Sequence, residues 1–150
     1  MKDYACERIY RDARITNIYE GTTQLQVVAA IRHVTTGTYL SRIREYEAIN
    51  YKPELGDLKK KLMAMTETYE KLVAMVLETK DNEYLDFQAR RLVEAGAHCV
   101  MGYLLLQDAN VDETYRRSAE VYINYGQAEV NKINGYISSF DMEDLGYYKQ

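Results

Sequence analysis

The sequence predicts an all-α protein, built as an up-down antiparallel helical bundle. Three long stretches after Pro53 carry apolar residues at alternating spacings of three and four, which is the period of an amphipathic helix. No stretch alternates apolar and polar residues for long enough to indicate a strand. A chain of 150 residues with 47% hydrophobic residues can bury a core without a disulfide or a metal ion.

Two helices are predicted in the N-terminal part. Residues 4–14 form a short helix, and residues 15–21 form a loop because β-branched residues, Asn and Gly discourage a helix. A second helix spans about residues 24–35, begins at a Thr23/Gln26 capping box and stops near Gly37. Its predicted apolar face consists of Leu25, Val28 and Ala29, with Ile31 at the edge.

Residues 38–53 are predicted to be a linker that contains the junction between two domains. Tyr39, Leu40, Ile43, Tyr46 and Ile49 can also make a short amphipathic helix there. The residue before a proline is disfavoured in a helix, so the chain turns at residues 50–53.

The bundle is predicted to occupy residues 54–140, followed by a loosely held tail at 141–150. Its helices span about 54–79, 82–107 and 111–140, with short turns at 81–82 and 108–110. The apolar stripes are Leu55, Leu58, Leu62, Met65, Tyr69, Leu72 and Val76; then Leu85, Ala89, Leu92, Gly96, Cys99, Tyr103 and Leu106; then Tyr115, Ala119, Tyr122, Gly126, Val130, Ile133, Ile137 and Phe140.

Composition narrows the function classes. A net charge of -4 argues against a broad nucleic-acid surface, and no apolar run is long enough to span a membrane. Cys6 and Cys99 share no metal-type spacing and are predicted to be buried, reduced thiols, which fits a cytoplasmic location. His33 and His98 lack ligand partners in the sequence, so no metal site is predicted.

The most specific signal is the stretch Glu7-Arg-Ile-Tyr-Arg-Asp-Ala-Arg-Ile-Thr-Asn-Ile-Tyr-Glu-Gly-Thr-Thr-Gln-Leu-Gln26. It resembles the C-terminal signature of the acyl-CoA dehydrogenase family, in which an Arg-Asp-Ala helix leads into Ile-Tyr-Glu-Gly-Thr. The later helices resemble, more weakly, the extra C-terminal helical domain of some larger members. Residues 1–37 are then the end of the catalytic helical domain and 54–140 an added bundle. A signature so near Met1 suggests an excised part of a longer enzyme.

The resemblance implies functional roles for several residues between positions 19 and 24. Glu20 is the base that removes the α-proton of the substrate, and Tyr19 and Gly21 contact the substrate. Thr22 and Gln24 contact the FAD cofactor, although the family often has Glu at the position of Gln24. The implied partners are acyl-CoA, an electron-transferring flavoprotein and further copies of the chain in a homo-oligomer.

The residues support this assignment chemically. An α-proton next to a thioester is weakly acidic, so a carboxylate must lie within hydrogen-bond reach of it. Burial beside the acyl chain raises the pKa of a carboxylate toward that task. Without the flanking motif, the interpretation of Glu20 would instead be a solvated surface residue.

Two alternatives remain open. The bundle after residue 54 contains no catalytic constellation, so it can instead be a non-catalytic assembly or interaction module. The 15 tyrosines can line the bundle core and its boundary, or form an interface with another subunit.

Overall fold

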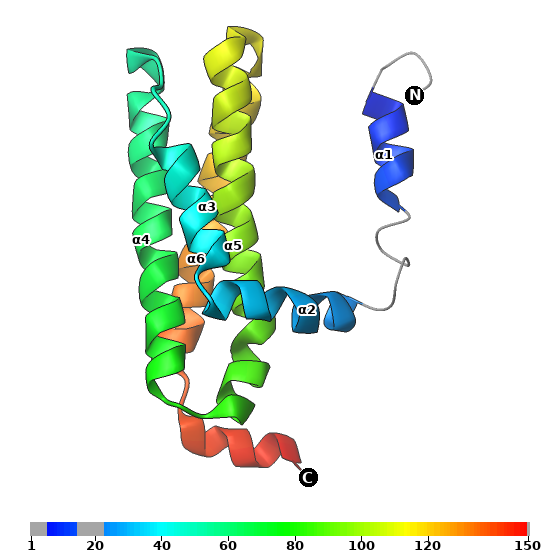
Figure 1. Ribbon diagram of the computed structural model, residues 1–150, viewed down its shortest axis with the longest axis vertical. Coiled ribbons are helices and arrows are strands. Elements are labelled where there is room, and N and C mark those ends of the chain that lie inside the picture. Colours follow the sequence, from blue (N-terminus) through cyan, green and yellow to red (C-terminus); the bar gives the residue numbers. More distant parts are fainter. Residues whose placement is uncertain (1–5, 15–22, 150) are drawn as a thin grey trace.

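The computed structural model describes residues 6–14 and 23–149, and every regular element within them is helical (Figure 1). The α-helices are α1 (Cys6–Arg14), α2 (Thr23–Thr35), α3 (Thr38–Glu47), α4 (Gly56–Glu78), α5 (Asn82–Val111) and α6 (Arg116–Ser139). The short 3-10 helices are η2 (Pro53–Leu55), η3 (Glu113–Tyr115) and η4 (Met142–Lys149). The predicted all-α class is confirmed.

The long helices α4, α5 and α6 lie side by side and run alternately up and down (Figure 1). Helix α3 packs on α4 and α5, and α2 crosses the bundle against α5. Helix α1 stands apart from the bundle in this view and buries none of its residues.

The core follows the predicted stripes closely. All seven apolar positions predicted for the first long helix are buried, from Leu55 in η2 to Val76 in α4. In α5 the prediction fails only at its first position, where Tyr84 is buried and Leu85 is half-buried. In the third helix, Ile123 is fully buried and Tyr115 is 51% exposed, because α6 begins only after η3.

The turn predicted at residues 108–110 is wrong, because α5 continues through it to Val111. The turn comes at Asp112, whose carboxylate accepts a hydrogen bond from the Thr114 amide at 2.9 Å. Asn110 stays helical, and its side chain holds the segment before η2. It accepts from the Lys52 amide at 2.8 Å and donates to the Asn50 carbonyl at 3.2 Å. At the other end of α5 the predicted cap is confirmed: Asp81 accepts from the amides of residues 83 and 84.

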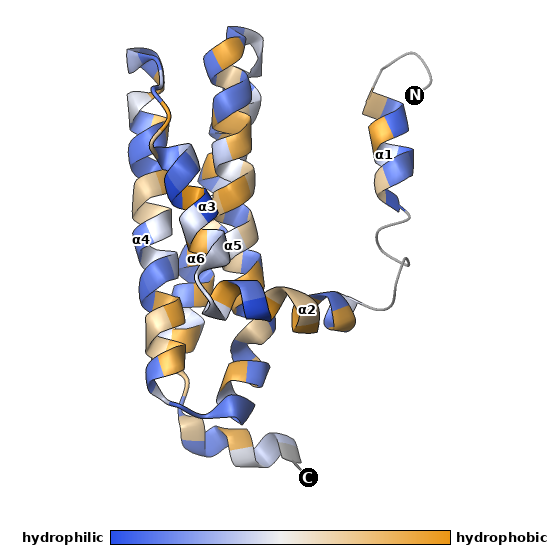
Figure 2. Cartoon of the chain, in the orientation of Figure 1, coloured by the Kyte–Doolittle hydropathy of each residue, from blue (hydrophilic) through white to orange (hydrophobic). Residues whose placement is uncertain are grey.

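The predicted apolar face of α2 is also wrong. Its buried residues are Val27, Ile31 and Val34, while Leu25 is 57% exposed and Val28 is 49% exposed. Residues 27–31 are all apolar, so periodicity alone could not choose between two overlapping stripes. Figure 2 shows hydrophobic residues along the length of α2 as well as along the bundle helices.

The segment predicted as a linker contains α3, whose Ile43 is completely buried. Gly37 separates α2 from α3 with a φ of 76°, a left-handed conformation that glycine adopts without strain. The division of the chain into two domains stays a prediction. The C-terminal segment folds as η4, where Leu145 is buried and the Tyr148 ring lies 5.1 Å from the Phe87 ring, so this tail is held on the bundle.

The two cysteines are both free thiols, but they differ in exposure. Cys99 is buried in the bundle, as predicted. The prediction of a buried Cys6 is wrong, because Cys6 is exposed on α1, a helix that has no buried residue.

Candidate functional site

Most of the predicted catalytic turn lies outside the described residues. Tyr19, Glu20, Gly21 and Thr22 fall in the stretch between α1 and α2, and their roles stay predictions. Gln24 is described, and its side chain is exposed in the first turn of α2. The candidate site described below is the surroundings of Gln24.

Gln24 lines a surface hollow where the start of α2 meets α5. The rest of its lining comes from one face of α5: Asp86, Phe87, Arg90, Arg91 and Glu94. Their spacing of three and four residues places them on one side of the helix. The hollow therefore lies between Gln24, which follows the predicted catalytic residues in the sequence, and a charged face of α5.

Arg90 and Glu94 form an exposed ion pair on this face. The Arg90 Nε atom lies 2.8 Å from the Glu94 Oε1 atom, one helical turn away. The hydrogen bond to Glu94 raises the pKa of Arg90, which keeps the guanidinium charged. Such exposed i,i+4 pairs stabilise a helix only slightly, so both groups remain available to a ligand.

Arg91 is the most constrained charge in the hollow. Its guanidinium lies 4.0 Å from the centroid of the Tyr136 ring and 5.1 Å from that of Phe87. Its Nη1 atom donates to the Phe87 carbonyl at 3.1 Å and to the Gln88 Oε1 atom at 3.3 Å. Sequence reasoning missed Arg91, because helical periodicity reports which face is apolar and does not report ring stacking between distant residues.

A cluster of rings fixes this end of the molecule. Phe140 lies 5.0 Å from Phe87, 5.7 Å from Tyr136 and 5.9 Å from Tyr84, measured between ring centroids. Together with Tyr148 on η4, these rings join α5, the end of α6 and the C-terminal segment. Two rings of this cluster, those of Phe87 and Tyr136, also contact the Arg91 guanidinium.

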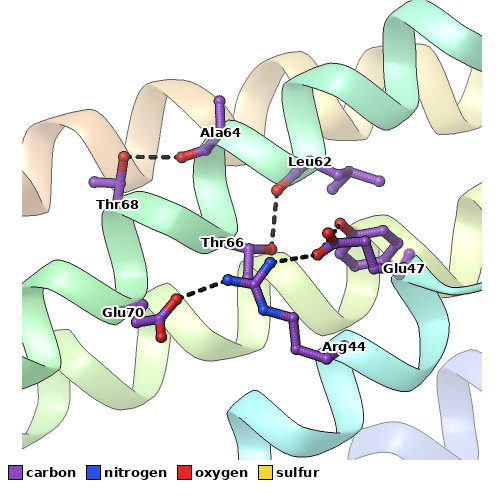
Figure 3. Close-up of polar contacts among 8 residues, drawn as sticks. Arg44, Glu47, Leu62, Ala64, Thr66, Thr68 and Glu70 are labelled. Carbon is purple, nitrogen blue, oxygen red and sulfur yellow. Dashed lines mark hydrogen bonds and ion pairs between the residues drawn. The ribbon is translucent and has the colours of Figure 1, made fainter.

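A second polar cluster joins α3 to α4 and α5 (Figure 3). Arg44 contacts Glu47 at 2.8 Å and Glu70 of α4 at 2.7 Å. The hydroxyl of Tyr103, which is buried in α5, donates to Glu47 at 3.4 Å. Burial raises the pKa of Tyr103, so its hydroxyl stays protonated and can donate this hydrogen bond to Glu47. These contacts hold α3 on α4 and α5, and we assign them a structural role.

An apolar pocket lies between the α2–α3 corner and α4. It is lined mainly by Val34, Leu40, Val73, Ala74 and Leu77. The ring of Tyr69 also borders it, and the buried Tyr69 hydroxyl has no hydrogen-bond partner among the described residues. Burial raises the pKa of Tyr69, so the hydroxyl is neutral.

The histidines and acidic residues make no metal site in the described part of the chain. His98 Nδ1 lies 3.2 Å from the Tyr122 hydroxyl, and burial lowers the pKa of His98. His33 instead stacks on Tyr39 with ring centroids 6.1 Å apart. Each histidine packs against tyrosine, away from the hollow.

Residues 35–145 match the family described as "Acyl-CoA dehydrogenase C terminal". The chain belongs to this family of all-α domains.

One solved structure and two curated proteins are also similar to this chain. A crystal structure of an acyl-CoA dehydrogenase family protein from Porphyromonas gingivalis is 57% identical with a TM-score of 0.73, covering 75% of this chain and 98% of that chain. An acryloyl-CoA reductase (NADH) from Anaerotignum propionicum is 59% identical over 34 residues, which are 23% of this chain and 9% of that protein. An acyl-CoA dehydrogenase from Bacillus subtilis is 47% identical over 38 residues, which are 25% of this chain and 10% of that protein. The matched stretches span about a tenth of the length of these curated relatives.

None of the helices within the described ranges combines the length and hydropathy required to cross a membrane.

Proposed function

We propose that this chain acts as the C-terminal part of an acyl-CoA dehydrogenase that oxidises acyl-CoA to trans-2-enoyl-CoA. The observation that carries the proposal is membership of the acyl-CoA dehydrogenase C-terminal family over residues 35–145. The Ile18-Tyr-Glu-Gly-Thr22 motif supports it, since it resembles the signature that holds the catalytic base. An electron-transferring flavoprotein is the proposed electron acceptor.

Glu20 is the proposed catalytic base. Its carboxylate takes the α-proton of the acyl thioester, while its backbone amide helps to hold the thioester carbonyl against the developing negative charge. FAD held by Thr22 and Gln24 would supply the acceptor for the hydride of the β-carbon. Tyr19 and Gly21 flank the acyl group, where the missing side chain of Gly21 permits a close approach to the backbone.

Thr22 and Gln24 are the proposed contacts to FAD. The exposed amide of Gln24 lies at the positive end of α2, beside a face of α5 with two arginines and two carboxylates, so donors for an anionic dinucleotide are present without a net positive charge. The donors present therefore fit the cofactor. For the isolated 150-residue chain we expect only weak FAD binding, because the proposed contacts Thr22 and Gln24 are one part of the cofactor site.

A second candidate reaction is the reverse one. The similarity to an acryloyl-CoA reductase (NADH) favours reduction of an enoyl-CoA, with Glu20 returning a proton to the α-carbon. The non-catalytic alternative is that residues 54–140 serve only assembly, for which the exposed Val121 and Tyr125 on α6 are the candidate surface of a homo-oligomer.

The test uses the full-length protein that contains this chain, mixed without oxygen with saturated acyl-CoA or with enoyl-CoA and NADH. Bleaching of a bound flavin by acyl-CoA supports the dehydrogenase, and consumption of NADH only with enoyl-CoA supports the reductase. A protein that carries no flavin and reacts with neither would contradict both reactions and leave the assembly role.

A further inference from the structure

The free edge of the Arg91 guanidinium carries the inference. A guanidinium has five N–H donors arranged in a planar fork. Both hydrogen bonds made by Arg91 use the Nη1 atom, to Phe87 and Gln88. Among the hydrogen bonds between described residues, none uses Nε or Nη2 of Arg91. One two-pronged edge of the fork therefore remains for a ligand.

The position of Arg91 is fixed before any ligand arrives. Tyr136 and Phe87 stack on the guanidinium, and the Phe87 carbonyl anchors one of its nitrogens. Because the side chain is already ordered, little conformational entropy remains to be lost on binding. A planar fork held this way matches two oxygens of one phosphate group.

The surroundings restrict the ligand further. The hollow around Arg91 opens beside Gln24, where the positive end of the α2 dipole adds to the attraction for an anion. Asp86 and Glu94 also line it and offset the charges of the two arginines. The hollow thus lacks a broad positive field, so binding depends on directed hydrogen bonds from Arg91.

We propose that Arg91 on α5, together with Gln24 on α2, binds a phosphate group of an adenine-nucleotide ligand of the enzyme, either FAD or acyl-CoA. This rests on the proposed function for the choice of ligand. In this proposal α5 contributes a binding residue to the ligand site, in addition to its packing in the bundle. Arg91 is a binding residue in this scheme and takes no part in proton transfer.

The test measures two dissociation constants in the full-length protein: FAD binding to the apoprotein by flavin fluorescence, and acyl-CoA binding to the FAD-loaded protein by calorimetry. Arg91→Gln should weaken one of them about tenfold, the loss expected for a charge-assisted bidentate contact. Arg91→Lys, which keeps the charge and loses the fork, should weaken the same one less. A loss confined to FAD or to acyl-CoA identifies the source of the phosphate.

Arg42→Gln is the matched control, because Arg42 also stacks on a tyrosine ring, at 5.0 Å from Tyr46, and lies on α3 away from the hollow. It should leave both constants unchanged. Should Arg91→Gln disturb folding, Gln24→Ala changes an exposed side chain only, and it should weaken the same ligand by a few-fold. Wild-type affinities in both Arg91→Gln and Gln24→Ala would overturn this inference alone, whereas a wild-type protein that binds neither ligand would overturn the proposed function with it.

Discussion

At the residue scale, three glycines set how closely the long helices approach. A Cβ atom at Gly102 would lie 2.4 Å from Leu62 Cδ2, and one at Gly96 would lie 3.2 Å from the Tyr69 ring. A Cβ atom at Gly126 would lie 3.2 Å from Met65 Cε. The large side chains of α4 thus fill the space that the three glycines leave on α5 and α6.

Substitution Gly102→Ala should destabilise the protein. Leu62 is fully buried, so its displaced methyl group must force a shift in a packed core. We expect a loss of about 1–2 kcal/mol in the free energy of unfolding, after the helical gain of alanine over glycine is included. Gly135→Ala in α6 is the control: it meets no atom within 4 Å and should stabilise by about 0.5–1 kcal/mol. Urea unfolding followed by circular dichroism checks both values, and equal shifts of the same sign would contradict the packing argument.

The two thiols should differ sharply in reactivity. Burial raises the pKa of the Cys99 thiol to about 12, so below that pH it stays protonated and unreactive, whereas Cys6 is exposed. At pH 8 the native chain should take up one iodoacetamide group, at Cys6, and a second only after unfolding. Mass spectrometry counts the groups, with Cys6→Ser as the control that should take up none. Rapid native labelling of Cys99 would show that the bundle opens.

At the scale of elements, α3 shows which contacts hold a short helix in place. Arg44 makes two ion pairs, but its side chain is 41% exposed, where such pairs contribute little. Ile43 is completely buried against the bundle. The apolar contact should therefore dominate.

The apolar and the ionic contacts of α3 can be compared at two neighbouring residues, Ile43 and Arg44. Ile43→Ala should lower the free energy of unfolding by about 2–5 kcal/mol, because it removes a buried side chain and leaves a cavity. Arg44→Ala should lower it by less than about 1 kcal/mol. Thermal unfolding of the two variants and the wild-type chain measures both, and a larger loss for Arg44→Ala would reverse the assignment.

The elements also show what periodicity can predict. All the apolar positions predicted in α4 are buried, because they recur over the whole length of the helix and so define one face, while the buried Thr66 was not predicted. The position of α2 was predicted correctly, but the face predicted to be buried was wrong. The consecutive apolar residues at 27–31 leave two stripes equally apolar. The end of α5 was missed because Asp108 and Asn110 are typical turn residues, yet Asn110 stays helical and binds the backbone near residue 52.

At the scale of the whole molecule, the sequence predicted the family through the Ile-Tyr-Glu-Gly-Thr motif at residues 18–22, while the matched family region begins at residue 35. The two signals lie in different parts of the chain and indicate the same class. The hollow around Gln24 could not be predicted, because it depends on how α2 crosses α5. That crossing is set by packing between residues some 60 positions apart, which a local pattern does not encode.

The central claim is that Glu20 removes the α-proton, and the most direct measurement is the rate of flavin reduction after rapid mixing of the full-length protein with acyl-CoA. Glu20→Gln should keep its bound flavin and its affinity for substrate, while the rate of reduction falls by a factor of about 10² or more, since a positioned base contributes that much. Glu7→Gln, on the exposed helix α1, should react at the wild-type rate. An unchanged rate of flavin reduction in Glu20→Gln would contradict the account.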